Sequence, residues 1–273
     1  SDNMLNRLTT DVPRAWKNGT KTSGDSPNFW WQNFRDETLN QAIEEALESN
    51  PNLQTAGTRL EIAWAQSKIS AADLFPQIAL SNGLSTSQMN MAQFGVSLPN
   101  VPSKFNSQRH SLTLGAQWEL DLWGRIRAGK KAARANALSQ AADFAGARHS
   151  LAGQLAKAWM LSIESRQQLR LARSTVTTYE TTVERIRARF EQGVRSSLDL
   201  RLATASLAAA NANVAERIHL ANRTTRQLEI LLGKIPVNQL KVPEKLPLIP
   251  STIPVGIPAE ILSRRPDIVA AEQ

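Results

Sequence analysis

Apolar residues recur at helical spacing through most of this 273-residue chain, with one interruption. The first periodic stretch, at 37–49, predicts a helix with one apolar face. Asn50 and Pro51 follow as a favourable N-cap and first helical residue, so a second helix is expected from residue 51 to about residue 74. The Phe75-Pro76 pair should end that helix, because proline disfavours the helical conformation in the residue before it.

Between about residues 77 and 123 the spacing changes from helical to alternating. A first run centres on Ile78, Leu80 and Leu84. In the second run the apolar positions Leu112, Leu114, Ala116, Trp118, Leu120 and Leu122 alternate with Ser111, Thr113, Gly115, Gln117, Glu119 and Asp121. Such alternation is typical of a strand with one apolar and one polar face. With the polar loop between them, the two runs predict a long β-hairpin.

One long helix is predicted from Gly124 to about Gln192, since no proline interrupts this stretch. Within it, apolar or small residues step alternately by four and three positions, which is the pattern of a coiled-coil seam. The seam consists of Leu151, Leu155, Ala158, Ser162, Ser165, Leu169, Ala172, Val176, Tyr179, Val183, Ile186 and Phe190. Roughly 69 residues at 1.5 Å each make about 100 Å of helix.

A shorter helix of the same kind is expected at 197–232. Gly193 should end the long helix, and Ser196 or Ser197 should cap the next one. Gly233 should stop it. The apolar stripe of this helix carries Leu200, Ala203, Leu207, Ala210, Val214, Ala221, Leu228 and Leu231.

The helix lengths indicate how these elements combine. Helices 51–74 and 197–232 sum to about 60 residues, or roughly 90 Å, which nearly matches the long helix. We therefore expect them to lie end to end beside it, with the hairpin at one end and the Gly193 turn at the other. Because many seam positions are Ala or Ser and the flanking faces are partly Ala-rich, a closed ring of helices is favoured over an isolated helical hairpin.

The predicted fold class is mainly α with one β-hairpin. The segments are 1–36, an extended N-terminal stretch with several aromatic residues; 37–75 and 124–232, a helical-barrel region; 76–123, the β-hairpin; and 233–273, a proline-rich connector that leads to a short helix at Pro258 and a new helix from Pro266.

Composition and charge exclude several kinds of site. The chain has no cysteine, so it has no disulfide and no zinc–thiolate site. Its histidines, His110, His149 and His219, are too far apart for metal-ligand spacing. The net charge is +8, but most basic residues are scattered beside acidic ones, so nucleic acid is not the expected partner. One tighter basic cluster follows Trp123: Arg125, Arg127, Lys130, Lys131 and Arg134.

Membrane helices and catalytic patterns are not predicted. No run of about 18 apolar residues occurs, and no signal peptide is visible, although a chain can begin after a processing site. Glu44, Glu45 and Glu48 lie on a polar helix face. Glu119 and Asp121 resemble a glycosidase carboxylate pair only superficially, and there is no Gly-rich phosphate loop. We therefore expect a protein that is not an enzyme and needs no metal or cofactor.

The alternating strand admits two interpretations, a half-buried strand of a soluble sheet or a strand that crosses a membrane. Its length and alternation, the tryptophans near its end and the basic cluster after Trp123 favour the membrane. In that interpretation Ser111, Thr113, Gln117 and Glu119 face the interior of a channel. The membrane-facing residues are then Leu112, Leu114, Trp118, Leu120, Leu122 and Trp123.

Two strings of residues are highly specific, Trp118 through Arg125 (WELDLWGR) and Arg264 through Ile268 (RRPDI). They agree with further residues spread over nearly the whole chain: Trp31, Phe34, Asp36, Leu39, Ala46-Leu47, Asn50 through Leu53, Pro76, Arg189 through Gly193, Leu198-Asp199, Leu231 through Gly233, Gly256 through Pro258, Leu262 and Ala271-Glu272. On these residues the chain resembles the outer-membrane efflux factor family, the TolC-like channels, and especially its OprM/NodT-like branch.

The resemblance implies a homotrimer in the outer membrane of a Gram-negative bacterium. Each protomer would have two structural repeats, contributing to a transmembrane β-barrel continuous with a periplasmic α-helical barrel. The channel would expel drugs or other solutes when a periplasmic adaptor couples it to an inner-membrane pump. The second repeat would begin near residue 273. The branch often carries a lipidated N-terminal cysteine, which is not in this sequence, and the resemblance leaves open a lipid anchor upstream of Ser1.

The resemblance also assigns a gating and adaptor-docking role to the turn between the two seam helices. Asp199 lies six residues after Gly193, where the family carries a gate aspartate; alternatively, it caps its own helix. The residues of this turn are Arg189, Gly193, Ser196, Leu198 and Asp199. A soluble periplasmic coiled-coil adaptor and, more distantly, a hydrolase are the competing functions. Within the channel interpretation, export of drugs, metals or polypeptides stays open.

Overall fold

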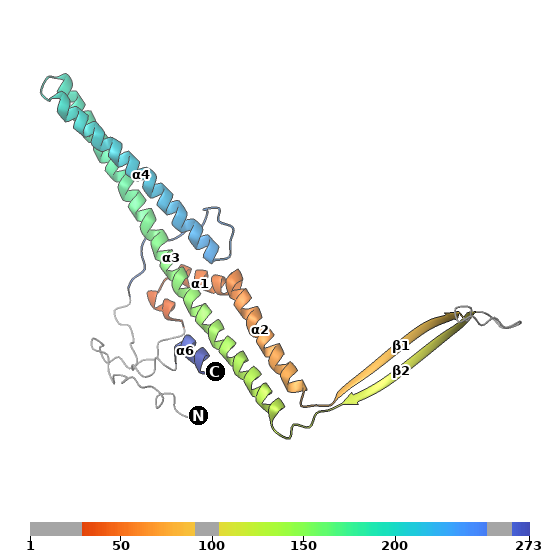
Figure 1. Ribbon diagram of the computed structural model, residues 1–273. Helices are drawn as coiled ribbons and strands as arrows, with labels where there is room; N and C mark the ends of the chain where they lie inside the picture. Colours follow the sequence, from red (N-terminus) through yellow and green to blue (C-terminus); the bar gives the residue numbers. More distant parts are fainter. Residues whose placement is uncertain (1–28, 91–103, 250–263) are drawn as a thin grey trace, which may run out of the picture. The chain divides into compact units, whose positions relative to one another are not determined.

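The computed structural model describes residues 29–90, 104–249 and 264–273, which form two compact units (Figure 1). One unit combines the described residues up to Glu61 with those from Leu138 onward, and the other is Ile62–Ala137. The elements are η2 (Trp30–Phe34), α1 (Glu37–Ser49), α2 (Pro51–Ala72), β1 (Gln77–Asn90), β2 (Lys104–Gln117), α3 (Arg125–Glu191), α4 (Ser197–Leu231) and α6 (Pro266–Glu272). The predicted helix at Pro258 lies outside the described residues.

The predicted helix boundaries are confirmed to within two residues, because the capping residues act as their types suggest. Asn50 Oδ1 accepts hydrogen bonds from the backbone N–H groups of Asn52 and Leu53 at 3.0 and 3.2 Å. Asp36 caps α1 in the same way through Thr38 and Leu39. The long helix α3 has 67 residues and therefore about 100 Å of helical rise.

The segment before α1 differs from the extended conformation predicted for it. Trp30–Phe34 forms a short 3-10 helix, in which Trp31 is 3% exposed. The compact turn brings Trp30 and Phe34 into edge-to-face contact, with ring centroids 6.2 Å apart, and Trp30 contacts Trp31 in the same manner. An extended chain would separate these rings, so their burial favours the turn.

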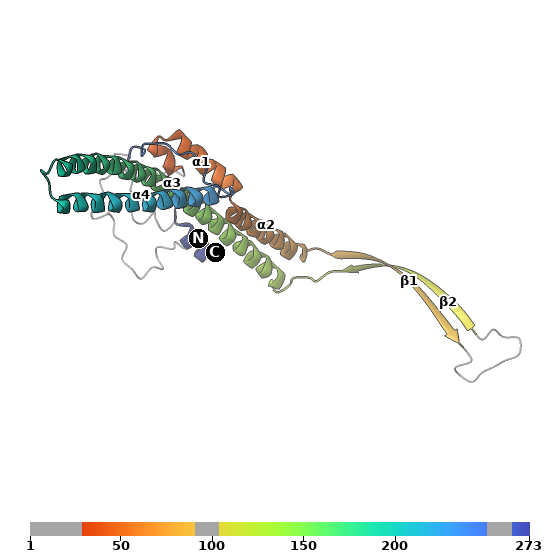
Figure 2. The same ribbon diagram turned by 90° about the horizontal axis from the view of Figure 1, so that it is seen from above.

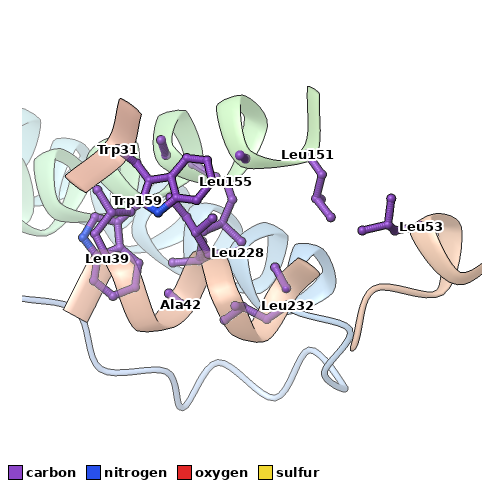
Figure 3. Packing of buried hydrophobic residues seen from close by; sticks show 14 of the residues in the cluster. Trp31, Leu39, Ala42, Leu53, Leu151, Leu155, Trp159, Leu228 and Leu232 are labelled. Carbon is purple, nitrogen blue, oxygen red and sulfur yellow. The ribbon is translucent and has the colours of Figure 1, made fainter. Parts of the chain in front are cut away.

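The core lies where α1 packs between α3, α4 and the aromatic turn (Figure 3). Leu39 and Ile43 of α1 are fully buried, as the apolar face of 37–49 predicts. Trp159 of α3 donates its indole N–H to Asp36 at 3.3 Å, so one carboxylate both caps α1 and fixes it to α3. The other buried members include Trp31, Leu53, Leu151, Leu155, Ile163, Leu228 and Leu232.

The helices α3 and α4 form an antiparallel pair, and α4 runs along the C-terminal part of α3 in both views (Figures 1 and 2). The central part of the predicted seam is buried, with Leu155, Ser162 and Ser165 at most 1% exposed, whereas Tyr179 and Phe190 of the same seam are 38% and 39% exposed. Ser165 and Thr224 hydroxyls lie 2.8 Å apart across it, and Ser162 and Thr225 hydroxyls lie 3.5 Å apart. Small hydroxyl residues therefore let the two helices approach closely without leaving polar groups unsatisfied.

The C-terminal end of α4 is joined to the junction of α1 and α2. Asn50 donates its side-chain amide to the Leu231 carbonyl at 2.9 Å, and Lys234 forms an ion pair with Glu45 at 2.7 Å. Gly233 has a φ of 73° and ends α4 as predicted.

A buried carboxylate holds the connector that follows α4. Glu229 is 2% exposed and accepts the backbone N–H groups of Asn238, Gln239 and Leu240 at 2.7, 2.7 and 3.0 Å. Arg166 of α3 donates to the Leu240 carbonyl at 2.7 Å, so the connector is fixed from both sides. Burial alone would raise the pKa of Glu229, but these three N–H groups, aided by the charge of Arg226, lower it below its ordinary value.

Candidate functional site

The β-hairpin is the first candidate site, because its register separates an apolar from a polar face. The pairing of Gln77 with Gln117 fixes an antiparallel ladder in which Leu80 lies opposite Leu114 and Ile78 opposite Ala116. Directly opposite residues share a face and alternate residues along a strand share it as well. The apolar side chains of both strands therefore lie on one face: Ile78, Leu80, Leu84, Leu112, Leu114 and Ala116.

This apolar face is uncovered in the described chain. Its leucine and isoleucine side chains are 67–73% exposed. Beyond the Leu84–His110 pair the same face becomes polar, with Thr86 opposite Gln108 and Gln88 opposite Asn106. The apolar character is thus confined to the half of the hairpin nearest the helices. Large contiguous apolar surfaces of this kind indicate contact with a membrane or another protein.

Along the same half of the hairpin, the opposite face carries small or polar residues and no large apolar one. Ser81 lies opposite Thr113 and Gly83 opposite Ser111, with Ser111 Oγ donating to the Gly83 carbonyl at 3.4 Å. The predicted interior residues Ser111, Thr113 and Gln117 are all on this face. The predicted division of strand 111–117 into two faces is therefore confirmed by the register, while the medium that each face contacts stays a prediction.

The second strand ends earlier than the alternation predicts. β2 stops at Gln117, so Trp118, Leu120, Leu122 and Trp123 are not strand residues. The ladder stops at the Gln77–Gln117 pair because Pro76 directly precedes Gln77 in the other strand, and proline has no N–H to donate.

Residues after β2 form a compact junction instead. Trp118 donates its indole N–H to the Leu74 carbonyl at 3.2 Å, and the Leu122 N–H bonds to the Leu120 carbonyl at 2.9 Å. Trp118, Leu120, Leu122 and Trp123 are all exposed, with Trp123 the most exposed at 88%. They remain candidates for contact with lipid, but by position in the junction and not by strand alternation.

The two carboxylates of the junction have structural partners. Asp121 accepts the backbone N–H groups of Ile126 and Arg127 at 3.2 and 2.8 Å, and so caps the start of α3. Glu119 pairs with Arg125 at 2.7 Å. Both carboxylates thus hold the start of α3 to the residues that follow β2.

The turn between α3 and α4 is the second candidate site. Gly193 has a φ of 76°, and the Arg189 carbonyl accepts the Val194 N–H at 2.9 Å, which is the left-handed helix ending that glycine permits. Ser196 and Asp199 form a capping box: Ser196 Oγ accepts the Asp199 N–H at 3.2 Å, and Asp199 accepts the Ser196 N–H at 3.3 Å.

The side chains of this turn expose both charge and apolar surface. Arg195 lies 3.7 Å from Asp199. Val194 and Leu198 are 69% and 62% exposed. The capping interpretation of Asp199 is thus observed directly, whereas a gating role needs a partner beyond the described residues.

No cluster of His, Asp or Glu side chains that could hold a metal ion occurs within 29–90, 104–249 and 264–273. Across the same residues, no helix combines the length and apolar character needed to cross a membrane. The buried carboxylate that sequence reasoning missed, Glu229, is fully engaged with backbone N–H groups.

The sequence profile of the family described as Outer membrane efflux protein matches residues 42–234, which include the hairpin, the junction and the turn. The chain belongs to this family. The family resemblance inferred from the WELDLWGR and RRPDI strings is thereby confirmed, and with it the outer-membrane location that the family name states.

The relatives found among characterised proteins are efflux proteins. The toluene efflux pump outer membrane protein TtgC of Pseudomonas putida is 32% identical over 247 residues, which are 89% of this chain and 50% of TtgC. The pyoverdine export outer membrane protein OpmQ of the same species is 27% identical over 268 residues, 95% of this chain and 56% of OpmQ. The chain thus spans about half the length of the curated relatives it matches.

The fold is that of solved outer-membrane channels. The outer-membrane channel OprN superposes on 96% of this chain with a TM-score of 0.78 and 31% sequence identity, and the matched part is 59% of OprN. The predicted TolC-like fold is therefore confirmed for this chain. A soluble adaptor, the competing interpretation, is not favoured, since the relatives are outer-membrane proteins and not adaptors or hydrolases.

Proposed function

We propose that this chain is part of an outer-membrane channel subunit that serves as a passive exit duct in a tripartite efflux system. The observation that carries the proposal is the hairpin, which exposes one apolar and one polar face in a member of the outer membrane efflux protein family. Strands of this kind suit a wall between lipid and a water-filled lumen. In the proposed arrangement, 76–123 lies in the membrane, and 37–75 with 124–232 lies in the periplasm.

The hairpin supports assembly with further strands. Fourteen residue pairs lie opposite each other in β1 and β2, and among the described residues no third strand pairs with either outer edge. Within a bilayer an unpaired edge leaves N–H and C=O groups without any partner, which only a closed barrel avoids. Strands from other parts of the protein and from other subunits must therefore complete the wall, and this requirement supports the homotrimer.

The helices support the same conclusion. Along α3 and α4 the central part of the mutual seam is covered, yet large apolar side chains on other faces are open, such as Leu171 at 61% and Leu202 at 59% exposure. A helix that buries only one of two apolar stripes has room for a second helical neighbour. A ring of helices around a lumen, continuous with the strands, would cover these side chains.

The proposed partners and cargo follow from the relatives and from the turn. TtgC belongs by name to a toluene efflux pump and OpmQ to pyoverdine export, so small organic molecules are the proposed cargo. A periplasmic adaptor and an inner-membrane pump would dock at the turn formed by Arg189, Gly193, Ser196, Leu198 and Asp199, where apolar and basic side chains are exposed together.

The test uses the full-length protein produced with the adaptor and pump encoded beside it in a Gram-negative host that lacks its own channel. Cells with all three components should expel a fluorescent organic dye, and cells without the channel should retain it. The outer-membrane fraction should contain a cross-linkable trimer. Dye retention in the presence of all three components, or a channel found outside the outer membrane, would overturn the proposal.

A further inference from the structure

A stripe of basic residues covers one side of α3 immediately after the hairpin junction. Arg127, Lys130, Lys131 and Arg134 are spaced by three and four residues and so share one helix face, and all four are exposed. The packed side of this helix end is different, since Ile126 and Ala137 are 6% and 0% exposed. The stripe therefore takes no part in the packing of α3 within the described chain.

The charge of the stripe is not neutralised within its own unit. Residues 62–137 contain three acidic residues, Asp73, Glu119 and Asp121, against eight basic ones. Glu119 is paired with Arg125, and Asp121 with Arg127 at 3.2 Å. Within the described residues, Lys130, Lys131 and Arg134 have no hydrogen-bond or ion-pair partner, so three cations remain to attract an external anion.

The residues just before the stripe are apolar and aromatic, and they are exposed as well. Trp123 is 88% exposed and Leu122 69%. Tryptophan combines a large apolar ring with one N–H donor, which suits the boundary between acyl chains and headgroups. The exposed apolar residues thus come directly before the exposed cations along the chain. In a membrane, the acyl chains likewise lie next to the layer of phosphate groups.

We propose that Lys130, Lys131 and Arg134 bind the phosphate groups of anionic phospholipids, such as phosphatidylglycerol, in the leaflet that borders the helical region. The exposed Trp123 and Leu122 contact the acyl chains of the same lipids. The inference rests on the proposed function, because the stripe meets headgroups only if the hairpin is inserted. Each cation near an anionic surface contributes a several-fold increase in affinity, so losing three should weaken binding at least about tenfold.

The test measures binding of fluorescent phosphatidylglycerol to the full-length protein in detergent, with phosphatidylcholine as the neutral reference. The variant is K130Q/K131Q/R134Q. The control is R173Q/R185Q/R187Q, which removes three exposed cations of the same helix at a distance in sequence from the junction. We expect the wild type to prefer phosphatidylglycerol, the variant to lose that preference by about tenfold or more, and the control to keep it. Raising the salt concentration should weaken binding to the wild type.

Four results would overturn the inference: no preference of the wild type for phosphatidylglycerol, an equal loss in the control, a stronger preference for lipopolysaccharide, or displacement of the lipid by millimolar inorganic phosphate. The dye-export test of the full-length wild type separates this inference from the proposed function. A wild-type protein that supports dye export but shows no lipid preference contradicts only the lipid site. A wild-type protein that fails to support dye export contradicts the proposed channel itself.

Discussion

A Cβ atom on Gly233 would lie 2.6 Å from the carbonyl oxygen of Ser49. This is closer than side chains approach backbone oxygens, and the φ of Gly233 is 73°, a conformation that other residues adopt only with strain. The contact joins the end of α4 to the junction of α1 and α2. Glycine is required here for two independent reasons, the backbone angle and the space.

Gly233→Ala should therefore destabilise the helical unit by at least about 2 kcal/mol. Gly153→Ala is the matched control, because it lies inside α3 and its added Cβ would meet nothing within 4 Å. That control should be neutral or slightly stabilising, by up to about 1 kcal/mol, since alanine favours helix. Chemical denaturation of the full-length protein in detergent, monitored by circular dichroism, measures the stability of both variants. Equal midpoints for the two variants would show that the backbone can move aside.

The face assignment of the hairpin is tested by neighbouring residues on one strand. Leu114 lies on the apolar face and Thr113 on the polar one. If the apolar face contacts lipid, Leu114→Arg should cost about 2–4 kcal/mol of barrel stability, whereas Thr113→Arg should cost much less because it points into water. The temperature at which the proposed full-length trimer dissociates measures the loss of stability in each variant. Similar losses for the two variants would contradict the assignment.

Glu229 predicts a specific dependence on pH. Its lowered pKa means that folding favours the carboxylate, so the stabilisation is complete above the ordinary carboxyl pKa, about 4.3. It is lost as the pH falls through the lowered pKa. Glu229→Gln should cost about 1–3 kcal/mol at pH 7, because its NH2 group cannot accept the N–H bonds that one carboxylate oxygen now accepts.

The difference between wild type and Glu229→Gln should shrink as the pH is lowered below about 4. Glu216→Gln is the control, since Glu216 is an exposed residue of the same helix. The denaturation midpoints of the wild type and of both variants are measured at pH 7 and at low pH. A difference that does not change with pH would mean that the hydrogen bonds, and not the charge, account for the effect.

Asp199 is tested by separating its two proposed roles. Ser196→Ala and Asp199→Ala both break the capping box, and each should cost about 1 kcal/mol of helix stability. Only Asp199→Ala removes a carboxylate from the turn. If that carboxylate helps to hold the channel closed, Asp199→Ala should raise the resting conductance of the full-length channel in planar bilayers above that of Ser196→Ala. Identical conductance in the two variants would leave capping as its whole function.

Local sequence signals predicted most of the helical fold because they act over short distances. Asn50 before Pro51, Gly193 and Ser196 each determine the backbone next to them, so the helix ends could be placed without knowledge of the tertiary structure. The seam of α3 could also be predicted from the sequence, since the spacing of its residues depends only on helix geometry.

The features that sequence reasoning missed depend on contacts between distant residues. The end of β2 at Gln117 depends on Pro76 in the partner strand. The alternation of apolar and polar residues continues past Gln117, although the residues there belong to no ladder. The role of Glu229 requires that the connector fold back onto α4, which no local pattern indicates. At the candidate site, the two faces of the hairpin were predictable, but the structural pairing of Glu119 and Asp121 was not.

The unpaired edges of the hairpin have a consequence for biogenesis. Before it reaches its partners, a chain with two 14-residue strands, few charges and two free edges can pair with any other extended polypeptide. The helical unit has its own core and does not face this hazard. If the hairpin enters the membrane as proposed, its strands must be shielded beforehand, and a periplasmic holdase that binds extended, weakly charged segments should bind this hairpin in preference to the helices.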